Sequence, residues 1–170
     1  DTFNRVFSNI DSNHFNASRV WKDGVSLVIM GDGPDKKMLQ DLAVSMPCNK
    51  HIVFSPFTKA PFGIIKNARC VTLTSFYEGF PMVLVESLSV GVPVVSLDIV
   101  SGPSEIIQHN YNGLLVKERD PEKFADALGV ICRDEVLYLK LKAQTQGSVQ
   151  QFSMQEISAK WDKLLQHVIR

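Results

Sequence analysis

Two glutamates lie on either side of a turn. Glu78 and Glu86 are eight positions apart, with the turn Gly79–Pro81 between them. Glu78 follows the apolar run Cys70–Thr74, which predicts a buried strand, and Glu86 lies in an apolar run starting at Met82 that is long enough for a helix. Moving a charge out of water is costly, so carboxylates beside buried elements usually have a partner or a task. These two glutamates are the first candidates for chemistry.

The predicted geometry of this turn suits an anionic ligand. The backbone amides of Gly79 and Phe80 lie near a helix N-terminus, where the helix dipole favours a phosphate. Glu86 falls in the second helical turn, and helical side chains lean toward the N-terminus, so its carboxylate can accept hydrogen bonds from a vicinal diol such as ribose. Glu78 then faces the other end of the ligand. A sugar nucleotide fits, with ribose at Glu86, diphosphate at the amides and hexose near Glu78.

An alternative interpretation gives both glutamates structural roles. Glu78 would cap the helix and Glu86 would lie on a solvated face. However, the neighbours of Glu86 on the helix are apolar, and they leave little room for a solvated face: Val83, Leu84, Val85, Leu88 and Val90. The pattern favours the functional interpretation.

Short apolar runs alternate with helical patterns along the chain. The predicted strands are Ser26–Met30, His51–Phe54, Cys70–Thr74, Pro93–Leu97 and Leu114–Val116. The predicted helices are Asp1–Ile10, Asp35–Met46, a short one in Phe62–Asn67, Met82–Val90, a short one starting at Gly102, Pro121–Cys132, one after Asp134 and Ser153–Val168. Such alternation predicts an α/β fold, a Rossmann-like doubly wound parallel sheet with helices on both faces. Residues 1–170 are expected to form a single domain.

Ligands of such sheets bind at the carboxyl ends of the strands. Three loops have this position: Gly31–Pro34, Ser55–Thr58 and Ser75–Pro81. Gly31 and Gly33 allow a ligand to approach the backbone closely, but their spacing is not the full dinucleotide-binding fingerprint. A tight turn without a ligand is an equally good interpretation of that first loop.

The composition excludes some partners. Eighteen basic and eighteen acidic residues give a formal charge of zero, so no overall field attracts nucleic acid. The three cysteines have no metal-ligand spacing and no metal site is predicted; Cys70 in an apolar strand favours reduced thiols and a cytoplasmic location. No signal peptide and no membrane-spanning run is recognisable. The chain does not begin with Met, which suggests a fragment of a longer protein.

The segment around the two glutamates resembles a known enzyme family. Phe76–Glu86 followed by Gly91–Val95 closely resembles the E-x7-E signature of retaining glycosyltransferases with the GT-B fold, of the family 4, group 1 type. Further landmarks of that family are similar in order and spacing from Ser26 to Cys132: Leu27–Pro34, Gly102–Ile107, Asn112–Val116 and Asp120–Pro121.

The resemblance implies that this chain is the C-terminal, donor-binding half of a GT-B enzyme. Carried over by motif position, Glu86 would hold the ribose hydroxyls and Glu78 would be the catalytic-site residue beside the transferred sugar. The other implied donor contacts are as follows: Gly79, Phe80 and Pro81 around the sugar and diphosphate, Pro56 and Phe57 beside the base, and Gly31 and Gly33 along the nucleotide floor. The implied reaction transfers a hexosyl unit from a nucleoside diphosphate sugar to an acceptor hydroxyl, with retention of configuration.

The resemblance also implies the partners. A UDP-sugar is the expected donor, with GDP- and ADP-sugars as alternatives, and neither a metal nor another cofactor is required. The acceptor, a glycan or lipid-linked glycan in polysaccharide, lipopolysaccharide or glycolipid synthesis, would bind the missing N-terminal domain of a parent enzyme peripheral to the inner face of the membrane.

The chain departs from the family at its N-terminal end. The first strand, the segment with the Arg/Lys pair for the diphosphate and the N-terminal domain are not recognisable, and Ser55-Pro56-Phe57 stands where the family often has Gly. The chain alone is therefore expected to be inactive. Two alternatives stay open: a non-catalytic nucleotide-binding module, and a GT-B epimerase or phosphorylase.

Overall fold

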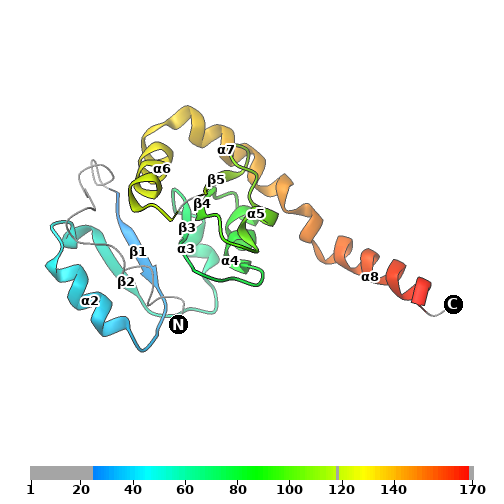
Figure 1. The fold of residues 1–170 in the computed structure, drawn as a ribbon, viewed down its shortest axis with the longest axis horizontal. Helices are drawn as coiled ribbons and strands as arrows, with labels where there is room; N and C mark the ends of the chain where they lie inside the picture. The colour runs from blue at the N-terminus through cyan, green and yellow to red at the C-terminus, as the bar shows by residue number, and fades with distance from the viewer. Residues whose placement is uncertain (1–24, 118, 169–170) are drawn as a thin grey trace.

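The computed structural model describes residues 25–117 and 119–168 (Figure 1). The helix predicted for 1–10 lies outside this part. The strands are β1 (Leu27–Met30), β2 (Ile52–Ser55), β3 (Val71–Leu73), β4 (Val94–Leu97) and β5 (Gly113–Val116). The α-helices are α2 (Lys36–Ser45), α3 (Phe62–Ile65), α4 (Met82–Ser89), α5 (Pro103–Ile106), α6 (Pro121–Arg133), α7 (Glu135–Ser148) and α8 (Met154–Val168), with 3₁₀ turns η2 (Asn49–His51) and η3 (Gln150–Phe152). The predicted alternation of strands and helices is confirmed.

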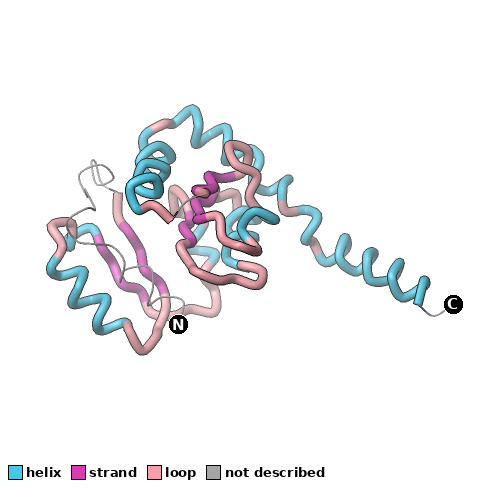
Figure 2. Tube along the Cα trace, viewed as in Figure 1, coloured by secondary structure: helices cyan, strands magenta, loops and turns pink. Residues whose placement is uncertain are grey.

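All strand pairs are parallel, but hydrogen bonding divides them into two sheets. β1 pairs with β2, and the second sheet has the order β3-β4-β5, with β4 in the middle. The two groups of strands are drawn in magenta in Figure 2. The sequence predicted a single sheet. Within the described residues no ladder joins β1 to β3, so the pattern of apolar runs identified the strands but not this division.

Helices cover both faces of the β3-β4-β5 sheet. Val94 and Val95 are adjacent in β4 and fully buried, and adjacent strand residues point to opposite faces. Val94 belongs to a core cluster with Leu84 and Leu88 of α4 and Ile106 of α5. Val95 belongs to a second cluster with residues of β5, α6 and α7. This arrangement confirms the doubly wound architecture predicted from the sequence.

The β1-β2 sheet is less completely covered. Val28 and Val53 are register partners and therefore share a face, and they remain 46% and 49% exposed. On the other face, Leu39 and Ala43 of α2 are buried, and Ala43 lines a shallow depression with Ile52 of β2. Among the described residues, this sheet therefore has a helix over one face only.

Acidic side chains cap the N-termini of α6 and α7. The Asp120 carboxylate accepts hydrogen bonds from the amides of Glu122 and Lys123 at the start of α6. The Asp134 carboxylate accepts one from the Leu137 amide in α7 at 2.9 Å. Such caps satisfy amides that have no partner inside the helix.

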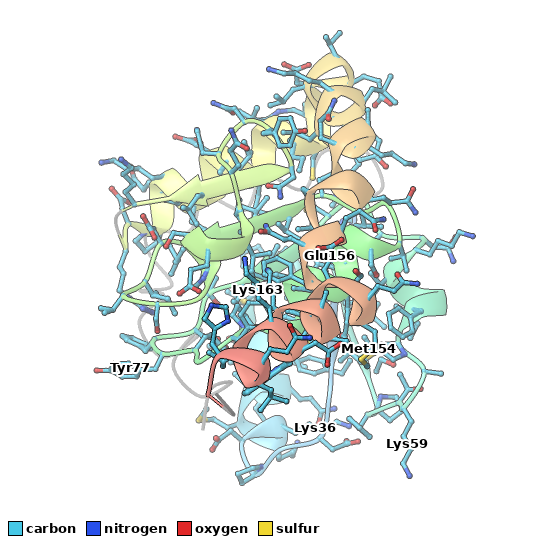
Figure 3. The ribbon with its side chains drawn as sticks, turned by 90° about the vertical axis from the view of Figure 1, so that its right-hand side faces the viewer. Lys36, Lys59, Tyr77, Met154, Glu156 and Lys163 are labelled. Carbon is cyan, nitrogen blue, oxygen red and sulfur yellow. The ribbon has the colours of Figure 1, made fainter. Side chains whose placement is uncertain are left out.

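Helix α8 extends away from the rest of the chain (Figure 1). Met154 and Glu156 lie near its start and Lys163 further along (Figure 3). Its apolar side chains are largely exposed, including Met154 at 81% and Trp161 at 58%. In the described part of the chain, no helix has both the length and the apolar character needed to cross a membrane.

Candidate functional site

The loop after β4 supports the turn that contains Glu78. The Ser101 hydroxyl donates a hydrogen bond to the Glu78 carbonyl oxygen at 2.8 Å. Gly102 has φ of 98°, and a Cβ placed there would lie 2.7 Å from Pro81 Cδ and 3.3 Å from the Gly79 carbonyl oxygen. Only a glycine allows this approach without displacement. The turn is therefore in direct contact with the neighbouring loop.

The loop after β5 supports the start of the same segment. The Arg119 guanidinium donates to the carbonyl oxygens of Thr74 and Ser75 at 3.2 and 3.3 Å. It also lies 3.4 Å from the centroid of the Phe76 ring, in the geometry of a cation–π contact. Burial lowers the pKa of Arg119, while interaction with Tyr77 raises it. Because β3, β4 and β5 are neighbours, their carboxyl-end loops meet at one sheet edge.

The C-terminal part of the chain also contacts this turn. The Phe80 ring packs edge to face against Phe152 of η3, with 5.1 Å between ring centroids. Phe80 stays 40% exposed and the preceding Tyr77 is 77% exposed, projecting at the edge of the molecule in Figure 3. The Phe80 ring is therefore held against the C-terminal part of the chain, while the Tyr77 side chain remains accessible.

The structure places the two glutamates as the sequence predicted, Glu78 before α4 and Glu86 in its second turn. Both are half-buried. Pro81 occupies the N-cap of α4 and no side chain caps the helix, so the alternative in which Glu78 is the cap is wrong. Among the described residues, neither carboxylate has a hydrogen-bond or ion-pair partner. A Cβ at Gly79 would meet nothing within 4 Å, so the turn has open space beside it.

The two earlier candidate loops are joined to each other. The Gly31 amide donates to the Ser55 carbonyl at 3.1 Å, and the Phe57 amide donates to the Asp32 carboxylate at 2.7 Å. Lys36 pairs with the same carboxylate at 2.5 Å. The hydrogen bond from Lys36, followed by that from the Phe57 amide, lowers the pKa of Asp32. The first and second loops therefore form one unit.

Several features of this unit leave room for a ligand. Gly31 has φ of 146°, a backbone conformation that favours glycine. A Cβ at Gly33 would meet nothing within 4 Å, so the space beside Gly33 is open. Pro56 is exposed and the Phe57 ring is 66% exposed. Helix α3 follows this unit and packs against α4, which connects it to the turn at Glu78.

Other polar residues have structural roles. Lys37 pairs with Asp41 on the surface of α2, and Lys36 pairs with Asp32, as expected for helix surface charges. The His109 ring accepts a hydrogen bond from the Leu115 amide. In residues 25–117 and 119–168, no three His, Cys, Asp or Glu side chains are gathered as for a metal ion.

Sequence reasoning missed three residues at these loops. Ser101 precedes a landmark that the sequence did identify, and Asp32 lies inside the glycine turn, so both stood next to a recognised pattern. Arg119 directly precedes the landmark Asp120–Pro121, but nothing in the sequence indicated its partners, which lie 44 and 45 positions away.

Comparison with known proteins identifies the family of this chain. The family model for glycosyl transferases group 1 matches residues 9–148, most of the chain. This chain belongs to the glycosyl transferases group 1 family. It is 30% identical over 147 residues to the exopolysaccharide phosphotransferase SCO2592 of Streptomyces coelicolor, covering 86% of this chain and 16% of that protein. It is 34% identical over 116 residues to lipopolysaccharide 1,6-galactosyltransferase of Salmonella typhimurium, covering 66% and 32%.

Solved glycosyltransferase structures share the fold. A mutant of Staphylococcus aureus TarM, in complex with Fondaparinux, alpha-GlcNAc-glycerol and UDP, superposes with a TM-score of 0.79 at 26% identity, covering 86% of this chain and 30% of that one. The lipopolysaccharide outer core galactosyltransferase WaaB gives a TM-score of 0.74 at 26% identity, covering 82% and 40%. The expected GT-B architecture, with this chain as the C-terminal domain, is confirmed. The chain spans less than half the length of each of these relatives.

Proposed function

We propose that this chain is the donor-binding domain of a retaining hexosyltransferase of glycosyltransferase family 4. The donor is a nucleoside diphosphate hexose, with UDP as the first expectation and GDP or ADP as alternatives. The acceptor is a glycan or lipid-linked glycan hydroxyl, bound by the remainder of a longer, cytoplasmic polypeptide peripheral to the membrane. No metal is required in this proposal.

One observation carries the proposal. Two half-buried carboxylates without protein partners flank the start of α4, which no side chain caps. Half-buried charges of this kind lose hydration without gaining a protein hydrogen bond, a cost that a bound polyol can offset. The TarM structure bound to UDP supports the nucleotide class, since that protein shares the fold and 26% of the aligned sequence.

Each residue has a defined task in this proposal. The Glu86 carboxylate accepts hydrogen bonds from the two ribose hydroxyls, and Glu78 accepts hydrogen bonds from hydroxyls of the transferred hexose. The amides of Gly79 and Phe80, together with the α4 dipole, stabilise the negative charge that develops on the leaving diphosphate. Gly31 and Gly33 let the nucleotide approach the backbone, and Pro56 and Phe57 border the base.

The test is donor turnover by the full-length protein. UDP-, GDP- and ADP-hexoses are supplied with lipid-linked glycan acceptors, nucleoside diphosphate release is measured, and NMR assigns the anomeric configuration of the product. We expect release with one base, a retained configuration, and strong loss of turnover in Glu78→Gln. Residues 1–170 alone should show no turnover. An inverted product would contradict retention, and nucleotide binding without any turnover by the full-length protein would favour a non-catalytic binding module.

A further inference from the structure

We propose that Arg119 is a positioning residue that holds Glu78 in place for sugar transfer. This inference rests on the proposed function and adds to it a residue outside the E-x7-E segment. The guanidinium contacts three consecutive residues at the end of β3: the carbonyls of Thr74 and Ser75, and the ring of Phe76. Glu78 follows two residues later.

The two hydrogen bonds hold the backbone that leaves β3, and the ring contact holds the Phe76 side chain. A planar guanidinium can donate to two carbonyls while lying flat on an aromatic ring, which a lysine ammonium cannot do. Ser75 is buried, so the held carbonyls are attached to the core rather than to a mobile surface. From this fixed start, the chain has one further residue, Tyr77, before the Glu78 carbonyl is held by Ser101. The backbone of Glu78 is therefore held on both sides.

The nucleotide end of the proposed site does not depend on Arg119. Glu86 lies inside α4, and that helix is anchored by Leu84 and Leu88, both fully buried in the core. Loss of Arg119 should thus displace Glu78 and leave Glu86 in place. A small displacement of a positioned group can lower the turnover rate strongly without weakening binding of the rest of the ligand.

The same strand provides a matched control. Arg69 precedes the start of β3 and uses the same chemistry as Arg119: it donates to the Ile131 carbonyl at 2.9 Å and lies 3.6 Å from the Tyr138 ring centroid. It also pairs with Glu135 at 2.7 Å. All these partners lie in α6 and α7, at the opposite end of β3 from the candidate site. Arg69→Met should therefore affect stability alone.

The experiment compares Arg119→Met, Arg119→Lys and Arg69→Met in the full-length protein, measuring kcat, donor KM and UDP affinity. We expect Arg119→Met to lower kcat about 10- to 100-fold, with UDP affinity unchanged within about twofold. Arg119→Lys should be intermediate, and Arg69→Met should keep the wild-type kcat. In a Glu78→Gln background, Arg119→Met should cause no further loss. Equal kcat values for the two Met variants, or a full additional loss in that background, would overturn the proposal.

A second measurement does not require catalysis. Amide hydrogen exchange of residues 76–78 should be faster in Arg119→Met than in Arg69→Met, and Arg119→Lys should restore part of the protection. The Gly79 and Phe80 amides precede Pro81, which is held against Gly102, and they should exchange alike in both variants. Equal exchange rates in this segment would overturn the positioning role even if the protein transfers sugar. Selectively faster exchange in a protein with no transfer activity would refute the proposed function while retaining the contact between Arg119 and the Glu78 segment.

Discussion

Gly102 offers the sharpest perturbation of the site, because a single methyl group added there meets the turn after Glu78. In Gly102→Ala the new Cβ would lie 2.7 Å from Pro81 Cδ, whereas an ordinary contact is at least about 3.4 Å. Pro81 is buried and its ring is rigid, so the backbone of the turn must move by about 0.7 Å, the difference between these distances. The substitution therefore acts on the candidate site directly.

Two costs add up in this variant. An alanine at φ of 98° is strained by about 1–2 kcal/mol, since L-residues rarely adopt this conformation. Overpacking against Pro81 adds about 1–3 kcal/mol. The free energy of unfolding should thus fall by about 2–5 kcal/mol. Displacing the turn should also weaken donor binding, because the amides of Gly79 and Phe80 move with Pro81.

A second glycine separates these costs. Gly91 has φ of 85°, but a Cβ there would meet nothing within 4 Å. Gly91→Ala should therefore lose about 1–2 kcal/mol from backbone strain alone and bind donor nucleotide normally. Urea unfolding gives the stability of both variants, and calorimetry with UDP gives their affinity for nucleotide. If Gly102→Ala matched Gly91→Ala in both measurements, the contact between Gly102 and the turn would contribute neither to stability nor to nucleotide binding.

Three further predictions concern polar and ionisable groups. Asn112 is buried and donates to Ser148 and to a backbone carbonyl, so Asn112→Asp should lower the free energy of unfolding by about 2–4 kcal/mol in urea titrations. Asp32→Ala should destabilise the loop at Phe57 at neutral pH. Because the pKa of Asp32 is lowered in the folded state, its contribution is present above the ordinary aspartate pKa of about 3.9 and is lost at lower pH, where wild type and variant should unfold alike. Burial, and secondarily a neighbouring thiol, raise the pKa of Cys70 to about 12, so iodoacetamide at pH 8 should modify it only after unfolding, as mass spectrometry can show.

The sequence predicted the elements better than the contacts between them. The helix predicted over Met82–Val90 is observed as Met82–Ser89, and Asp120 caps α6 as its side-chain chemistry indicates. These features depend on residues close together in the sequence, where periodicity and capping preferences act. The strand pattern likewise predicted the order of strands and helices along the sequence. It did not predict that hydrogen bonding divides the strands into two sheets.

The supports of the site depend on residues far apart in the sequence. Ser101 reaches Glu78 across 23 positions, and the Phe57 amide reaches Asp32 across 25. Neither pairing produces a local pattern, and a serine or an aspartate in a loop has many possible partners. The positions of Glu78 and Glu86 were predictable because a strand, a turn and a helix follow one another directly there. The contacts that hold the turn in place could be identified only from the three-dimensional structure.

The central claim is that this domain binds a nucleotide donor through the Glu86 carboxylate. Calorimetric titration of UDP into wild type and Glu86→Gln tests it most directly, with Glu105→Gln of helix α5 as the control. If the Glu86 carboxylate holds the ribose hydroxyls, the Gln variant should bind UDP more weakly by roughly 1–3 kcal/mol, about 5- to 150-fold in Kd, because a charged acceptor is lost. The control should bind as wild type does. Equal affinity of wild type and Glu86→Gln would remove Glu86 from the site and contradict the account.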